Sequence, residues 1–73
     1  MTRYLSAEDR SHDDFGMPFT NRQGEAVYDA ATKMGPWATM TEANFRKSGR
    51  GLGNGLGQKY IRDHAGHLNK VEG

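Results

Sequence analysis

The stretch that decides the fold is Gly35-Pro36-Trp37-Ala38-Thr39-Met40-Thr41-Glu42-Ala43-Asn44-Phe45. Its Gly-Pro pair ends whatever element precedes it, and Trp37 follows with the largest apolar surface of any residue in the chain. Thr39 or Thr41 can then cap a helix over residues 42–47, and Gly49 supplies a left-handed stop. The stretch therefore predicts one short helix and places Trp37 in the core.

Hairpins are predicted on both sides of this helix. Before it, the runs 15–20 and 25–29 flank a turn that contains glycine, which is typical of a β-hairpin whose first strand lies at a sheet edge. After it, residues 58–63 and 67–71 flank a second turn. The sequence thus predicts an α+β fold, a small single domain with two β-hairpins flanking one short helix.

The composition predicts a domain with a thin core. The chain has 73 residues, enough for one domain over 1–73, and we consider residues 1–14 as a peripheral N-terminal segment in which Ser6 starts a short helical turn. Only 34% of the residues are hydrophobic, and cysteine is absent, which excludes disulfides and thiolate zinc sites. Partner binding or self-association is then the remaining source of stability.

Charge and hydropathy point to a cytoplasmic protein in a host cell. No apolar run is long enough to span a bilayer, and the first ten residues lack the order of a signal peptide. The net charge of +1 divides into −2 through Pro36 and +3 from Trp37 onward. The basic half is either a solvated surface or a phosphate-binding patch.

Every second residue from Gly49 to Gly57 is glycine. This strict alternation excludes the dinucleotide-binding fingerprint, which needs an odd offset between two of its glycines, and no lysine-serine pair follows to make a P-loop. Three readings stay open: successive turns with positive φ, close packing under Trp37, or direct contact with a ligand. Contact with a ligand predicts that bulky substitution at Gly53 or Gly55 abolishes binding without unfolding the domain.

Asp29, the Gly35-Pro36-Trp37-Ala38 block and the run Gly51–Tyr60 resemble a group of short bacteriophage proteins of unassigned function. Many of these look like zinc-ribbon modules, with one cysteine pair before the first hairpin and another after the tryptophan. Three of the four matching positions here cannot act as strong zinc ligands. The resemblance therefore implies a degenerate zinc-ribbon-like fold without metal or cofactor. The matching positions are His12, Phe15, Thr41 and Asn44.

The resemblance also implies a function. Phages devote many genes of this size to inhibiting host enzymes or defence complexes, so we predict a non-enzymatic phage protein that docks on and inhibits a host or defence-system protein. An anti-CRISPR-like counter-defence role is the sharpest form. The predicted scaffold is Trp37, Phe45, Phe15 and Tyr60. The predicted partner contacts are Arg46, Arg50, Asn54, Lys59 and Arg62.

Two alternatives remain from the sequence. A nucleic-acid-binding accessory protein would use the same basic residues, and its complex would weaken steeply with added salt. A virion component would form stable homo-oligomers and associate with particles. No catalytic residue, metal or membrane contact is predicted in any of these versions.

Overall fold

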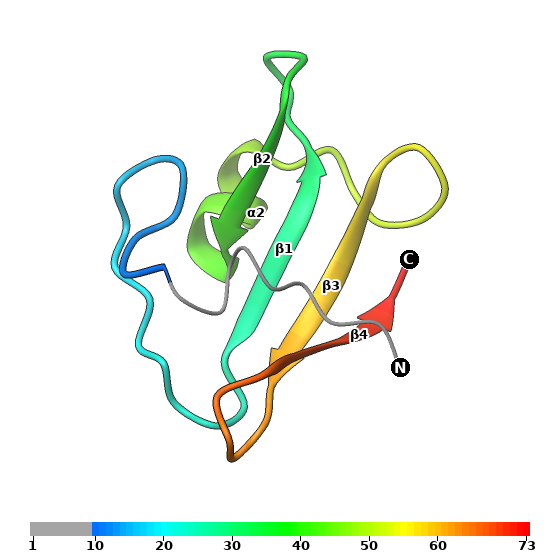
Figure 1. Ribbon diagram of the computed structural model, residues 1–73. Helices are drawn as coiled ribbons and strands as arrows, with labels where there is room; N and C mark the ends of the chain where they lie inside the picture. The colour runs from blue at the N-terminus through cyan, green and yellow to red at the C-terminus, as the bar shows by residue number, and fades with distance from the viewer. Residues whose placement is uncertain (1–9) are drawn as a thin grey trace.

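Every strand of the sheet pairs antiparallel with its neighbours, in the order β2-β1-β3-β4 (Figure 1). The computed structural model describes residues 10–73, and a short helix, α2 (Glu42–Ser48), packs against β1 and β2 on one face of the sheet. The fold over these residues is therefore a four-stranded sheet with one helix. The strands are β1 (Ala26–Ala31), β2 (Trp37–Thr41), β3 (Gly57–Arg62) and β4 (Leu68–Glu72).

The predicted helix and its Thr41 cap are confirmed. The hydroxyl of Thr41 accepts the Asn44 N–H at 3.4 Å, and an acidic first turn and a basic last turn complement the helix dipole. The predicted left-handed stop at Gly49 is wrong, because Gly49 has a φ of −74°. Its N–H bonds the Phe45 carbonyl at 2.8 Å, and the extended chain then forms a bridge with Thr32 beyond the end of β1.

Two hairpins do flank the helix, but the first uses different strands from those predicted. β1 pairs with β2, whereas residues 15–20 form a loop with one isolated bridge from Pro18 to His12. Pro18 has no N–H to give to a sheet, and neighbouring polar residues bind the loop to β2 instead. The second predicted hairpin is confirmed as β3–β4, closed by a turn in which Asp63 accepts two backbone N–H groups.

The sheet has a core on each face. On the helix side Tyr28 and Met40 are buried, and the Phe45 ring stacks on Tyr28 with centroids 4.1 Å apart. The predicted scaffold role of Phe45 is confirmed by this stack, and that of Tyr60 by its place in the opposite core. That core contains Phe19, Val27, Tyr60 and Leu68.

The core placements of Trp37 and Phe15 are wrong, because these side chains are 48% and 45% exposed. Side chains alternate along a strand, and Met40 on β2 faces the helix, so Trp37 faces away from it. Trp37 also begins an edge strand, and no further strand formed by residues 10–73 pairs with its outer side. Phe15 lies in the loop beside that edge.

The alternating glycines from Gly49 to Gly57, the glycine row, combine two of the predicted roles: turns with positive φ and close packing. Gly53 and Gly55 have φ of +115° and +75° within the turns that lead into β3, where other residues are strained. Gly57 is instead a close approach, because an added Cβ would lie 2.4 Å from the Ala30 Cβ. The close packing is thus against β1 rather than under Trp37.

Candidate functional site

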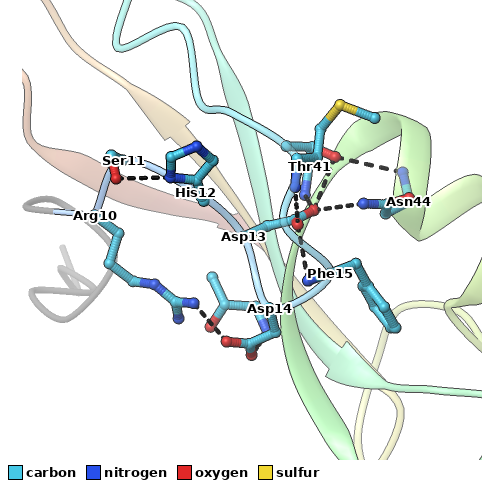
Figure 2. Close-up of polar contacts among 10 residues, drawn as sticks. Arg10, Ser11, His12, Asp13, Asp14, Phe15, Thr41 and Asn44 are labelled. Carbon is cyan, nitrogen blue, oxygen red and sulfur yellow. Dashed lines mark hydrogen bonds and ion pairs between the residues drawn. The ribbon is translucent and has the colours of Figure 1, made fainter.

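The carboxylate of Asp13 joins three segments of the chain (Figure 2). One of its oxygens accepts hydrogen bonds from the Thr41 N–H and hydroxyl, both at 3.0 Å, and from the Asn44 side-chain amide at 2.7 Å. The other accepts the N–H groups of Phe15 and Met17, both at 2.9 Å. Asp13 is 4% exposed, so this carboxylate is a buried structural centre.

The surroundings of Asp13 keep it ionised. Burial raises the pKa of its carboxyl, but the hydrogen bonds from Thr41, Asn44 and the loop backbone outweigh burial, so that the pKa lies below its usual value. Its neighbour Asp14 bonds the edge of β2 and pairs with Arg10. Residues 10–14 are therefore attached to the sheet, and the rest of the predicted peripheral segment 1–14, with its turn at Ser6, lies outside the described residues.

The positions matched to zinc ligands by the resemblance lie around this carboxylate. Thr41 and Asn44 bind it through their side chains, and Phe15 binds it through its backbone. His12 is exposed and bonds Ser11 at 2.8 Å. Residues 10–73 contain no group of three or more side chains suited to hold a metal ion. Hydrogen bonds to Asp13 connect these segments in this chain.

A second feature is an apolar surface along the outer edge of β2, which we call the edge patch. Trp37 and Phe15 line a hollow of about 330 Å³ together with Met34, which is 64% exposed. Met17, 39% exposed, lies on the same loop as Phe15 and lines a separate hollow of about 430 Å³ at the other end of β2, beside Thr41. The edge patch consists of Phe15, Met17, Met34, Pro36 and Trp37.

The backbone of β2 is covered at one end and open at the other. The Thr39 N–H bonds the Asp14 carboxylate at 2.7 Å, and the Asp14 N–H bonds the Thr39 carbonyl at 2.9 Å. Alternation along an antiparallel strand directs the N–H and C=O of Trp37 outward as well. Within residues 10–73 these two groups have no hydrogen-bond partner. Unpaired backbone therefore accompanies the exposed ring.

The predicted partner contacts do not form one surface. Arg46, Arg50 and Asn54 are exposed, whereas Lys59 lies on the helix face with its amine 5.9 Å from the Tyr28 ring centre. Arg62 is 2% exposed, so its predicted place at a contact surface is corrected to the interior.

Arg62 is buried because β3 places it in the core opposite the helix, beside Glu25. Its Nε pairs with the Glu25 carboxylate at 3.1 Å, and one terminal nitrogen donates to the Gly66 carbonyl at 2.9 Å. The same carboxylate accepts the N–H groups of Thr20 and Asn21. The Arg62 guanidinium thus connects the β3–β4 turn at Gly66 to the segment 20–25 before β1.

Three cations lie together at the β1–β2 turn, and of these Arg50 is a predicted partner contact whereas Lys33 and Lys47 are not. The Lys33 N–H bonds the Ser48 carbonyl, and the Arg50 N–H bonds the Ala31 carbonyl, so the end of α2 runs beside the β1–β2 turn. This brings the backbones of Lys33, Lys47 and Arg50 to one end of the molecule. All three side chains are exposed, and within residues 10–73 none of them has an acidic partner.

The sequence contains a signal for the edge patch, which differs from the predicted strand at Phe15 and the predicted core position of Trp37. Phe15-Gly16-Met17-Pro18 and Met34-Gly35-Pro36-Trp37 both combine large apolar residues with glycine and proline. Such pairs indicate turns, and turns lie at the surface, so the apolar residues within them are exposed.

Comparison with known proteins found no match among family models, curated proteins or solved structures. No helix in the described part of the chain is long and apolar enough to cross a membrane. A proposal of function for this chain therefore rests on the edge patch and the three cations at the β1–β2 turn.

Proposed function

We propose that this chain is a non-enzymatic binding module that docks on a larger partner protein through the edge patch. The observation that carries the proposal is the grouping of exposed apolar side chains. Phe15, Met17, Met34 and Trp37 are four of the five large hydrophobic residues exposed in residues 10–73, and all four lie beside β2. The fifth, Val71, lies on β4 at the opposite edge of the sheet.

The residue types in the edge patch suit a protein partner. Tryptophan is enriched among the residues that dominate binding energy at protein interfaces, and methionine adapts its shape to a partner surface. Large apolar side chains that gather at one exposed edge of a small domain mark a site that something covers. Covering this patch would also add to the stability of a thin core.

A second copy of the chain is a less suitable partner. A two-fold dimer whose axis passes close to Trp37 would place Lys33, Lys47 and Arg50 of both copies near one another. Like charges at close range oppose association. A different protein avoids this repulsion. The role of phage inhibitor, with its anti-CRISPR-like form, remains our prediction for what such docking does.

The experiment compares capture of bacterial proteins by the wild type, Trp37→Ala and Val71→Ser. Val71→Ser is the matched control, because Val71 is 52% exposed but lies away from the edge patch. Met34→Ser serves as a second patch variant. Circular dichroism establishes that each variant is folded. We expect one stoichiometric protein with the wild type and Val71→Ser, and its loss with Trp37→Ala and Met34→Ser.

Three results would overturn the proposal. A captured protein that all variants retain would place the interface elsewhere. Nucleic acid alone in the eluate, removed by nuclease or high salt, would favour the nucleic-acid-binding alternative. Stable homo-oligomers in sedimentation, dispersed by Trp37→Ala, would assign the edge patch to a second copy and favour the virion component.

A further inference from the structure

We infer that the partner surface recognised by the edge patch is an apolar protein segment flanked by acidic side chains. This inference rests on the proposed function and adds the charge of the partner to it. It comes from three cations, Lys33, Lys47 and Arg50, whose backbones the fold gathers from two separate segments at the β1–β2 turn, the turn that carries Met34 and Pro36 of the patch.

The position of these cations follows from backbone hydrogen bonds. Lys33 lies next to Met34 in the exposed run 33–37 that ends at Trp37. The Lys33 N–H to Ser48 carbonyl bond, 2.8 Å long, brings the last turn of α2 to this run. Arg50 lies beside the end of β1, because its N–H donates to the Ala31 carbonyl at 2.9 Å. Ala31 in turn pairs with Trp37 on β2.

The acidic groups nearby do not neutralise this end. Asp14 lines the same hollow as Trp37, but it is paired with Arg10 and bonds Thr39. Glu42, at the far end of α2, pairs with Arg46 at 3.2 Å. Within the described residues the three cations thus lack acidic partners, whereas these two acids have cationic ones. Asp29 also lacks a cationic partner within residues 10–73, but it is half-buried in β1 beside Asp14, whereas the three cations are exposed. Negative charge on the partner complements these exposed cations.

An acidic protein segment fits these features better than a nucleic acid. Two methionines and a proline surround the two aromatic rings of the patch, and such side chains offer apolar contact rather than a series of stacking platforms. The net charge of the chain is only +1, which is low for a phosphate-driven interface. The unpaired positive charge is local, at the end of the molecule that holds the β1–β2 turn.

The test uses two synthetic peptides with the same central phenylalanine and leucine residues, one flanked by glutamates and the other by lysines. Trp37 is the only tryptophan in the chain, so its fluorescence reports directly on the edge patch. Neither peptide contains tryptophan. We expect the acidic peptide to shift the emission of Trp37 to shorter wavelength with saturation, and to bind about tenfold more tightly than the basic one.

Charge reversal supplies the specific control. The triple variant Lys33→Glu, Lys47→Glu, Arg50→Glu should reverse the preference between the peptides, whereas Lys70→Glu on β4, remote from the patch, should leave it unchanged. Added salt should weaken binding of the acidic peptide to the wild type.

The outcomes separate this inference from the proposed function. Equal binding of both peptides to the wild type, lost in Met34→Ser, which keeps the Trp37 reporter, would overturn the acidic partner and leave apolar docking intact. Binding of neither peptide would also overturn the acidic partner, while capture of a protein that depends on Trp37 would still support docking. Preference for a single-stranded oligonucleotide over both peptides would overturn both by assigning the patch to nucleic acid.

Discussion

Thr41 donates two hydrogen bonds to the same oxygen of Asp13, one from its N–H and one from its hydroxyl, both at 3.0 Å. Thr41 is also the last residue of β2 and the cap of α2. One carboxylate therefore fixes the loop before the sheet to the junction of a strand and a helix. The same loop carries Phe15 and Met17, so this bond pattern also positions two of the five residues of the edge patch.

Replacing Asp13 should be among the most destabilising changes at this junction. Asp13→Ala leaves the Thr41 N–H and the Asn44 amide unpaired in a buried place, at a cost of about 3 kcal/mol. In a domain of this size such a loss lowers Tm by roughly 10–20 °C. Thermal unfolding by circular dichroism measures it. Asp14→Ala is the control, because Asp14 is exposed, and an equal loss there would contradict the special role of Asp13.

Acid should unfold the protein through the same carboxylates. The pKa values of Asp13 and Asp14 lie below their usual value of 3.8, because hydrogen bonds outweigh burial at both. Their contribution is therefore complete above about pH 5 and is lost as the pH falls through the lowered folded pKa. Urea unfolding between about pH 7 and pH 2 should show this decline. A pH dependence that is unchanged in Asp13→Asn would contradict the assignment.

Zinc should have no effect on stability. Of the four positions that the resemblance matches to zinc ligands, only His12 has a side chain that binds zinc well, and its ring is exposed and bonded to Ser11. Thermal unfolding with added zinc and with a chelator should therefore give the same Tm. A stoichiometric zinc signal in the purified protein would show that other residues complete a site.

Two glycines of the row should respond differently to alanine. At Gly57 an added Cβ meets the Ala30 Cβ at 2.4 Å and the Gly51 carbonyl oxygen at 2.7 Å, so Gly57→Ala must shift β3 away from β1. We expect a loss of about 3 kcal/mol from overpacking. Gly53 has open space but positive φ, so Gly53→Ala should cost only about 1 kcal/mol. Urea unfolding that ranks them in reverse would contradict this reading.

Local patterns predicted much of the fold. The Thr41 cap, the helix after it and the β3–β4 hairpin depend on neighbouring residues, and all three are confirmed. The first hairpin was misassigned because β1 can pair with a run on either side of it. The choice of β2 depends on Asp13 and Asp14, which bind across more than twenty residues.

The candidate site was harder to predict because exposure depends on the order of strands. Trp37 would have been buried in a central strand, but β2 lies at an edge. Arg62 appeared to be a surface cation, yet its place on β3 opposite Leu68 brings it beside Glu25. Neither outcome follows from the residue type, since both depend on which element becomes the neighbour.

Asp29, in the middle of β1, has a carboxylate whose charged form lowers the free energy of unfolding. Burial raises its pKa, as does the nearby charge of Asp14, and no hydrogen bond from residues 10–73 reaches it. A raised folded pKa means that stability is lost as the pH rises through it, so the charged form opposes folding at neutral pH.

Asp29→Asn should therefore raise the free energy of unfolding at about pH 7, by less than about 1 kcal/mol because Asp29 is partly exposed. Near about pH 3, where the wild-type carboxyl is largely protonated, the gain should shrink. Urea unfolding at both pH values measures the difference. A variant less stable than the wild type at neutral pH would contradict the prediction that the Asp29 charge opposes folding.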